Sequence, residues 1–261
     1  MLTVLDRLPK PAVIAHRGAS AHAPENTLEA FQLAIDYGAD AIELDVRLTA
    51  DNQVIVHHDA HLDAGAPPKR RISSSTLDEL RAYAAPSPGR NADDHQSILT
   101  LPEVLEHFAG KIPLNIEMKD LASPWGNLPD LVAEIVLAGQ YEELVLMSSF
   151  NPLAVRKIHH ALPPAATGYL IKYPWRWMIT SVLFQRLIPH QSVHLPLHGV
   201  SKYLIEQCHH SGRKVFVYTV NKPSQVLQLA RFKVDGIFTD DPLMARQALE
   251  GEDFRQNSPF Q

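Results

Sequence analysis

Six charged or histidine side chains cluster around three short apolar runs in the first half of the sequence. They are His16 and Arg17 after the first run, Glu43 and Asp45 in the second, and Glu117 and Lys119 in the third. Glu43 and Asp45 are two residues apart in an extended segment, so their side chains share one face at a spacing of about 6.6 Å. Buried carboxylates are costly unless they are paired or bind a metal. The pattern therefore predicts a site in which these acids act together.

The third run places another carboxylate beside the first two. Alternation along this run puts Glu117 and Lys119 on one face, and neighbouring strands lie about 4.8 Å apart. Glu43, Asp45 and Glu117 can then converge on one point. Three oxygen anions without cysteine suit a divalent metal ion such as Mg2+ or Ca2+. The alternative is a salt-bridge network in which Arg17 and Lys119 neutralise the acids without a metal.

Histidine titrates near neutral pH, so a pair of histidines can serve as general acid and general base. Among the 14 histidines of the chain, we expect His16 and His58 to flank the three acids. Strand alternation should turn His57 away from His58. The pairs at 159–160 and 209–210 end predicted helices, where a positive charge complements the helix dipole, and we expect no catalytic role for them.

Short apolar runs alternate with amphipathic segments, and repeated strand-then-helix units predict a parallel sheet. The predicted strands cover residues 12–15, 41–46, 54–58, 114–117, 144–147, 168–171, 193–195, 215–220 and 236–238. The predicted helices cover residues 27–35, with Asn26 as the cap, and 129–137, 152–159, 202–210 and 225–232. A chain of 261 residues matches the usual size of one (β/α)8 TIM barrel, whose chemistry lies at the carboxyl ends of the strands.

The run at 54–58 would make a ninth strand, and it follows the second too closely for a crossover helix. Asp51 and Asn52 supply turn chemistry. We therefore expect residues 46–58 to form an antiparallel hairpin that brings His58 opposite Asp45. Removing this hairpin from the count leaves eight strands for the barrel.

The stretch from about 59 to 97 is rich in proline, serine and basic residues, and only residues 76–83 look helical. We predict that it is a small insertion after strand two, within a single domain that covers residues 1–261. The polar tail from Gly251 is expected to be loose.

Composition excludes several classes of protein. The net charge of -5 and the pI of about 6.3 argue against nucleic acid as a partner, because binding it requires a basic face. No run of 18 apolar residues is present, so we expect no transmembrane segment. Cys208, the single cysteine, forms no intrachain disulfide and is read as a packing residue. We expect a cytoplasmic enzyme, and the sequence does not indicate an oligomeric state.

Several ordered motifs resemble the glycerophosphodiester phosphodiesterase family, in its bacterial cytosolic form. They are His16-Arg17-Gly18, Glu25-Asn26-Thr27, Gly38 to Val46, Thr49-Ala50-Asp51, His58-Asp59, Asn115 to Lys119, Ser149-Phe150, Thr219-Val220-Asn221 and Val234 to Pro242. The resemblance extends from about residue 12 to 243. Three positions depart from the family pattern: Asn52 replaces a glycine, the run begun by Leu62-Asp63 is broken off, and Tyr218 stands where tryptophan is usual.

This resemblance implies roles for the residues that the spacing had gathered. A divalent ion, Mg2+ or Ca2+, would bind Glu43, Asp45 and Glu117. His16 and His58 would be the catalytic acid and base. Arg17 and Lys119 would contact the substrate phosphate. The implied reaction is the metal-dependent hydrolysis of glycerophosphodiesters, the small-molecule substrates, to sn-glycerol 3-phosphate and an alcohol, a reaction of lipid and glycerol metabolism.

Two other functions fit the same residues. The first is a lysophospholipase D-type hydrolysis of lysophospholipids at the same site. It is suggested by the aromatic and apolar stretch from Tyr173 to Phe184, a candidate for weak contact with a membrane surface. The second is a non-catalytic phosphate-binding barrel, which would require a missing histidine or acid, and none is missing.

Overall fold

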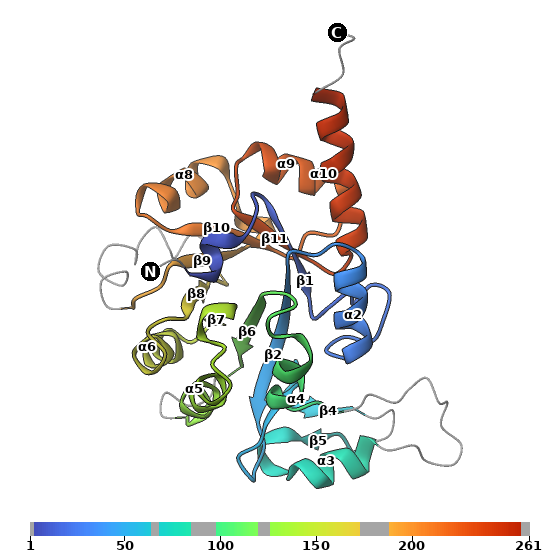
Figure 1. Ribbon diagram of the computed structural model, residues 1–261, viewed down its shortest axis with the longest axis vertical. Coiled ribbons are helices and arrows are strands. Elements are labelled where there is room, and N and C mark those ends of the chain that lie inside the picture. Colours follow the sequence, from blue (N-terminus) through green and yellow to red (C-terminus); the bar gives the residue numbers. More distant parts are fainter. Residues whose placement is uncertain (1–2, 64–67, 85–97, 120–125, 173–187, 257–261) are drawn as a thin grey trace.

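Eight parallel strands form a closed barrel in the computed structural model, which describes residues 3–63, 68–84, 98–119, 126–172 and 188–256 (Figure 1). The strands are β1 (Ala12–His16), β2 (Ala41–Leu48), β6 (Leu114–Met118), β7 (Val145–Ser149), β8 (Ala166–Leu170), β9 (Ser192–Pro196), β10 (Lys214–Tyr218) and β11 (Gly236–Thr239). They follow the order β1-β11-β10-β9-β8-β7-β6-β2, and the pairing of β1 with β2 closes the ring. The predicted (β/α)8 barrel is confirmed.

Helices ring the barrel (Figure 1). They are α2 (Leu28–Asp36), α4 (Leu101–Phe108), α5 (Leu128–Ala138), α6 (Pro152–Ala161), α8 (Lys202–His210), α9 (Pro223–Arg231) and α10 (Pro242–Gln256). The five predicted barrel helices are confirmed to within two residues at each end. The sequence analysis did not predict α4 or α10, and α10 extends to Gln256, beyond the start of the polar tail at Gly251.

The cap of α2 differs from the prediction. Thr27 is the N-cap, and its hydroxyl accepts a hydrogen bond from the Ala30 N–H at 3.2 Å. Asn26 precedes it in the left-handed conformation, with φ of 58°, and its side chain is turned into the protein. Thr and Asn both favour helix caps, so residue type alone did not separate the two positions.

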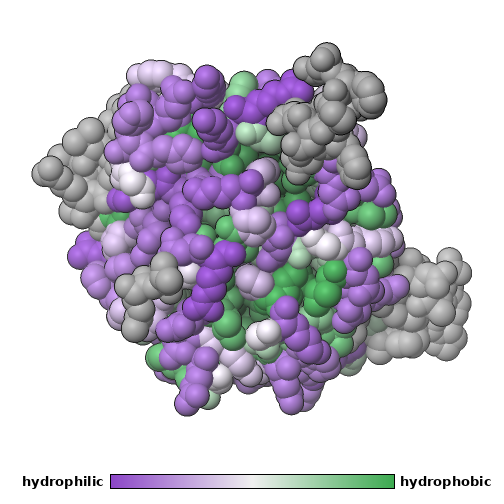
Figure 2. All heavy atoms as spheres, turned by 45° about the horizontal axis from the view of Figure 1, so that its top comes forward, coloured by the Kyte–Doolittle hydropathy of each residue, from purple (hydrophilic) through white to green (hydrophobic). Residues whose placement is uncertain are grey.

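The barrel interior is packed at its amino-terminal end and open at the other. Ile14, Phe216 and Phe238 fill the interior, and the short helix α1 (Val4–Arg7) adds Val4 and Leu5 to the same cluster. A second apolar layer lies between the strands and the helices. Figure 2 shows a face on which hydrophilic side chains predominate and hydrophobic ones are visible between them. Apolar side chains close the amino-terminal end of the barrel. The polar groups inside the barrel therefore meet solvent at the other end, where the strands have their carboxyl ends.

The predicted hairpin is present, but its register is shifted by one residue. β3 (Val54–Val56) pairs antiparallel with β2, with Val46 opposite Val56. His57 lies opposite Asp45, because its N–H donates to the Asp45 carbonyl at 2.9 Å. The turn is centred on Asp51 alone, with Asn52 in the left-handed region at φ of 60°. The expected pairing of His58 with Asp45 was therefore wrong, although His58 still faces the mouth of the barrel.

The segment after β3 contains the short antiparallel pair β4 (His61–Leu62) and β5 (Arg70–Arg71), the turn η1 (Ile72–Ser74) and the expected helix α3 (Leu77–Ala84). Leu62, Ile72 and Leu80 pack on Ile55 of β3 in a small separate core. The assignment of residues 1–261 to one domain stays a prediction. In the described part of the chain, no helix has both the length and the apolar character needed to cross a bilayer.

Candidate active site

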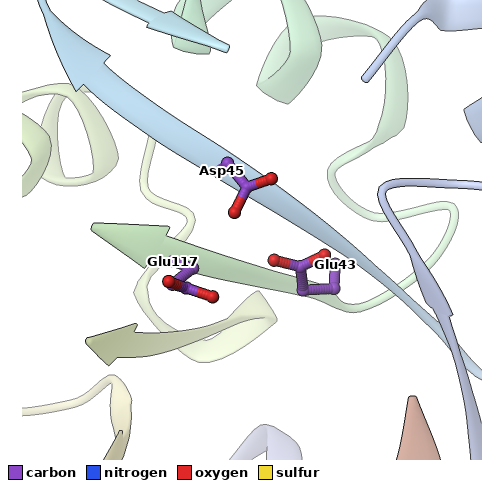
Figure 3. Close-up of side chains that lie close together, drawn as sticks. All are labelled: Glu43, Asp45 and Glu117. Carbon is purple, nitrogen blue, oxygen red and sulfur yellow. The ribbon is translucent and has the colours of Figure 1, made fainter. Parts of the chain in front are cut away.

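Three carboxylates meet at the carboxyl end of the barrel. Glu43 and Asp45 project from β2 and Glu117 projects from β6, and the three point toward one another (Figure 3). The register places Asp45 directly beside Glu117 on the neighbouring strand. One oxygen of each carboxylate lies within 4.8 Å of the others, and all three residues are buried. The structure thus brings the three predicted metal ligands together.

Two cations are packed against these acids. Lys119 Nζ lies 2.9 Å from Asp45 Oδ1 and 2.5 Å from Glu117 Oε1. Arg17 Nε lies 3.3 Å from Asp45 Oδ2, and the Arg17 backbone N–H donates to Glu43 Oε2 at 2.9 Å. Arg17 adopts a left-handed conformation, with φ of 60°. In this conformation its N–H points at Glu43 and its side chain reaches Asp45.

The charges in this cluster do not balance. Burial raises the pKa of Glu43 well above its usual range, and the neighbouring Asp45 and Glu117 raise it further. Burial also raises the pKa of Glu117. Burial alone would raise the pKa of Asp45 too, but Lys119 and Arg17 outweigh it and hold that pKa low. Three carboxylates therefore share two cations, and Glu43 is the least compensated of them.

The donor set fits a divalent metal ion. All three ligands are carboxylates, the oxygen donors that Mg2+ and Ca2+ prefer. Within the described residues, Glu43 Oε1 is buried and lacks a hydrogen-bond partner. Such an oxygen has lost its water contacts without replacement, which is costly unless a cation binds it. The triad can accordingly hold one divalent ion, whereas a salt-bridge network of Arg17 and Lys119 alone leaves Glu43 Oε1 without a partner.

His16 and His58 both line the cavity above the acids, and each is held by a carboxylate. His16 Nδ1 lies 2.6 Å from Asp240 Oδ1, and His58 Nδ1 lies 2.8 Å from Asp59 Oδ1. Burial lowers the pKa of His58, and the nearby Asp45 offsets this only in part. With Nδ1 engaged in each ring, Nε2 is the nitrogen that each histidine can offer to a substrate.

Three of the supporting residues were not assigned to the site by the sequence reading. Asn26 Nδ2 donates to Asp45 Oδ2 at 3.1 Å, so Asn26 helps to fix a metal-ligand candidate. Asp240 orients His16 from the far end of the chain, 224 residues away. Asp59 lies beside His58 in sequence. All three belong to the motifs that resemble the family, and this was the one signal in the sequence that pointed to them.

Arg47 also supports the site, and no signal in the sequence singled it out. Its Nε and one terminal nitrogen donate to the His58 carbonyl at 2.8 and 2.6 Å. The other terminal nitrogen donates to the Lys119 carbonyl at 3.4 Å. A single guanidinium therefore ties together the backbones of two candidate site residues that are far apart in sequence.

The cavity above the acids has a volume of about 220 Å³. Its other wall is mostly neutral and consists of Phe150, Leu170, His194, Tyr218, Thr219 and Phe238. The rings of Phe150 and Tyr218 meet edge to face at 6.0 Å. Tyr218, one of the departures from the family pattern, thus lies in the cavity itself. The stretch from Tyr173 to Phe184, proposed for membrane contact, lies outside the described residues.

Comparisons with known proteins agree with this geometry. Residues 16–244 match the Glycerophosphoryl diester phosphodiesterase family. A glycerophosphodiester phosphodiesterase of Caldanaerobacter subterraneus subsp. tengcongensis is 32% identical over 238 residues, which cover 89% of this chain and 95% of that protein. A protein of the same name from Bacillus altitudinis is also 32% identical, over 88% of this chain and 94% of its own length.

Solved structures show the same fold. An Oleispira antarctica phosphodiesterase in complex with the product sn-glycerol-3-phosphate has a TM-score of 0.82 at 26% identity and covers 95% of this chain and 100% of its own. The glycerophosphodiester phosphodiesterase of Thermotoga maritima has a TM-score of 0.72 at 28% identity, with 91% and 97% covered. Because both the family match and the 32% identical relatives span most of the sequence, this chain belongs to the glycerophosphoryl diester phosphodiesterase family.

Proposed function

We propose that this protein hydrolyses glycerophosphodiesters to sn-glycerol 3-phosphate and an alcohol. The observation that carries the proposal is the convergence of Glu43, Asp45 and Glu117 between His16 and His58 at the open end of the barrel. Relatives that bear the name of this activity are 32% identical over most of the chain. The product-bound structure from Oleispira antarctica supports the same product class.

In this mechanism Arg17 and Lys119 contact the nonbridging phosphate oxygens and offset the charge that develops there. Both cations already lie at the acids, so a substrate phosphate would share them with Asp45. Glu43, Asp45 and Glu117 would hold the divalent ion. When bound, such an ion supplies Lewis-acid polarisation of a phosphoryl oxygen. Either Mg2+ or Ca2+ suits three carboxylates, and metal restoration after chelation would identify the ion that is used.

His16 and His58 carry the proton transfers. One accepts a proton from the nucleophile through Nε2, the bond from phosphorus to the alcohol oxygen breaks, and the other histidine gives its proton to the leaving oxygen. The nucleophile is either water or the glycerol 2-hydroxyl, which would form a cyclic diester before water opens it. Asp240 and Asp59 orient the two rings and stabilise the protonated imidazole of each. Both assignments of acid and base are compatible with this arrangement.

A second candidate is the lysophospholipase D-type reaction at the same site. Apolar side chains next to the cavity, including Leu170, Ile171 and Leu197, favour it because an acyl chain could lie against them. Sedimentation with liposomes separates the two candidates, since an enzyme for small diesters should stay in the supernatant.

We also propose that the reaction takes place in the cytoplasm and belongs to lipid and glycerol metabolism. The lone cysteine, the buried Cys208, is compatible with a reducing compartment.

The decisive experiment measures the release of glycerol 3-phosphate from glycerophosphocholine and glycerophosphoethanolamine. The assay is run before EDTA, after EDTA, and after restoration of Mg2+ or Ca2+. Activity that EDTA abolishes and a metal restores is the expected result. Turnover that is insensitive to EDTA would contradict the metal role of the triad. No turnover with either ion, on these diesters or on lysophospholipids, would favour the non-catalytic phosphate-binding barrel.

A further inference from the structure

His16 is held at the mouth of the barrel by residues that follow two other strands. β1, β11 and β10 are neighbours in the barrel (Figure 1). His16 ends β1, Asp240 directly follows β11, and Asn221 lies shortly after the end of β10. Because the carboxyl ends of neighbouring parallel strands lie side by side, these three side chains can meet above the barrel.

Asn221 fixes both the side chain and the backbone of Asp240. Its Nδ2 donates to Asp240 Oδ2 at 2.5 Å, and its Oδ1 accepts from the Asp240 backbone N–H at 3.0 Å. The other carboxylate oxygen of Asp240, Oδ1, lies 2.6 Å from His16 Nδ1. Ser20 Oγ also lies 3.3 Å from Oδ1, but its single proton has a nearer acceptor in the His16 carbonyl at 2.8 Å. Rotation of the Asp240 carboxylate would therefore break its contacts with Asn221 and His16 together.

These contacts determine where the proton between Asp240 and His16 lies. Burial alone would raise the pKa of Asp240, but the hydrogen bonds from His16 and Asn221 outweigh it and hold that pKa low. An ionised carboxylate only accepts hydrogen bonds, so the proton belongs to His16 Nδ1. In neutral His16 the unprotonated nitrogen is then Nε2, which is the one that can take part in proton transfer with a substrate.

The second histidine of the site is held in a different way. Asp59, its carboxylate partner, follows His58 directly in the chain, with Oδ1 at 2.8 Å from His58 Nδ1. The side chain of Asp59 is 74% exposed, whereas that of Asp240 is 32% exposed. Water can therefore compete for the Asp59 contact more easily than for the Asp240 contact. The site thus invests more structure in the orientation of His16.

Resting on the proposed function, we propose that Asn221 is a positioning residue for the reaction, which acts through Asp240 to keep the His16 ring in the orientation and tautomer that proton transfer requires. We call Asn221, Asp240 and His16 the positioning chain. Misorientation of a catalytic group slows the chemical step more than it weakens substrate binding. The role of Asn221 should therefore appear in kcat and not in KM.

The first test is Asn221→Ala, assayed for the release of glycerol 3-phosphate from glycerophosphoethanolamine. It should lower kcat by about tenfold with KM nearly unchanged, as expected when an orienting contact is lost. Because Asn221 is exposed, the thermal transition should remain near that of the wild type. Gln32→Ala is the matched control, since Gln32 donates from an exposed amide to a carboxylate, that of Asp36 at 3.0 Å, on α2 outside the site. Its kinetics should equal those of the wild type.

A double-variant cycle shows whether Asn221 acts through Asp240. Asp240→Ala should lower kcat by about 100-fold, and Asn221→Ala/Asp240→Ala should be no slower than Asp240→Ala alone, because the contact is already lost. Asn221→Ala/Asp59→Ala should instead show the product of the two single effects, since Asp59 orients the other histidine. Independent effects of Asn221→Ala and Asp240→Ala would overturn the inference.

Asn221→Asp separates the role in positioning from a role in supporting the loop. This variant keeps an oxygen that can accept from the Asp240 N–H, but it replaces the amide donor with a second carboxylate that repels Asp240. Its kcat should fall at least as far as that of Asn221→Ala. A value near that of the wild type would mean that Asn221 supports only the backbone, and it would overturn the inference even if Asn221→Ala fails to fold.

A measurement without substrate keeps the test independent of the reaction. In the NMR spectrum of the metal-free protein, the Nδ1 proton of His16 should appear far downfield because its hydrogen bond to a carboxylate is short. His16→Ala identifies this resonance by its loss. In Asn221→Ala the resonance should shift upfield or broaden, and in Gln32→Ala it should stay in place. An unchanged resonance in Asn221→Ala would overturn the positioning role. No turnover by the wild-type protein would instead remove the proposed function, while the resonance would still report the positioning chain.

Discussion

The two sides of the barrel mouth bury polar groups in contrasting ways. On the side of β1, β2 and β6, burial raises the pKa of Glu43. The neighbouring carboxylate of Asp45 raises this pKa further, so ionising Glu43 there costs more free energy. On the side of β9, burial lowers the pKa of His194 to about 3, so this side chain is neutral at any ordinary pH. His194 packs against Phe216 and Phe238, with ring centroids 5.4 and 5.0 Å away. We call these the charged side and the neutral side.

The difference indicates how the barrel divides its tasks. The charged side keeps groups that the fold would be more stable without, because fixed charges are needed to bind a metal and a phosphate. The neutral side consists mainly of side chains that pack well without a partner ion. Substitutions on the charged side should therefore change activity far more than stability, and those on the neutral side should do the reverse.

Glu43→Gln should give the largest loss of activity. This substitution removes the least compensated carboxylate of the triad and should therefore weaken metal binding. Turnover should fall by about 1,000-fold, because the bound metal would stabilise the charge of the transition state by several kcal/mol. The metal-free variant should also be at least as stable as the wild type, because a buried and repelled charge has disappeared. Steady-state kinetics, metal titration and chemical denaturation check the three statements.

Glu29→Gln, an exposed position on α2, is the control and should leave both activity and metal affinity unchanged. The comparison of the two sides would break if Glu43→Gln kept its metal affinity. It would also break if the metal-free Glu43→Gln protein were strongly destabilised, because the carboxylate would then contribute to the fold.

His16→Ala and His58→Ala come next. Each should lower turnover by at least about 100-fold, the usual contribution of general acid or base catalysis, while metal affinity and the thermal transition remain near those of the wild type. His107→Ala, an exposed position on α4, should have no effect on turnover. Near-normal turnover in either active-site variant would refute the proton-transfer roles.

The charged side was largely readable from the sequence because strand alternation is a local rule. Two acids separated by one residue must share a face of a strand, and the structure places Glu43, Asp45 and Glu117 together. The hairpin was readable for the same reason, since too few residues connect β2 and β3 for a helix. Its exact register was not, because it depends on whether the turn is centred on one residue or between two.

The remaining parts of the site depend on how distant segments meet. Asp240 reaches His16 only because β11 closes the barrel next to β1. In the sequence, His194 is one histidine among 14. Its ring fits beside Gly168 only because that residue has no side chain, since a Cβ there would lie 2.6 Å from His194 Nε2. No local pattern encodes either contact, so the neutral side could not be predicted from periodicity.

Arg47→Met tests a residue on the charged side that acts through the backbone. Loss of the hydrogen bonds to the His58 and Lys119 carbonyls should lower kcat by about tenfold with little change in KM, since a charge-assisted hydrogen bond contributes about 1.5–3 kcal/mol. Arg47→Lys should recover part of this loss. The control is the same substitution, Arg156→Met, at an exposed position of α6. A rise in KM alone would show that Arg47 binds substrate and does not position the two residues.

The neutral side should reveal itself in the dependence of stability on pH. The unfolded chain protonates His194 near pH 6.5, whereas the folded protein resists protonation until about pH 3. The unfolded state therefore binds more protons in this window. The free energy of unfolding should fall by about 1.4 kcal/mol for each unit of pH below 6.5 on account of this residue. Denaturation of the wild type at pH 7 and pH 5, compared with His194→Gln, isolates this contribution from that of the carboxylates. Equal losses of stability in the two proteins would mean that His194 is hydrated or protonated in the fold, and the contrast between the two sides would then fail at the residue that best expresses it.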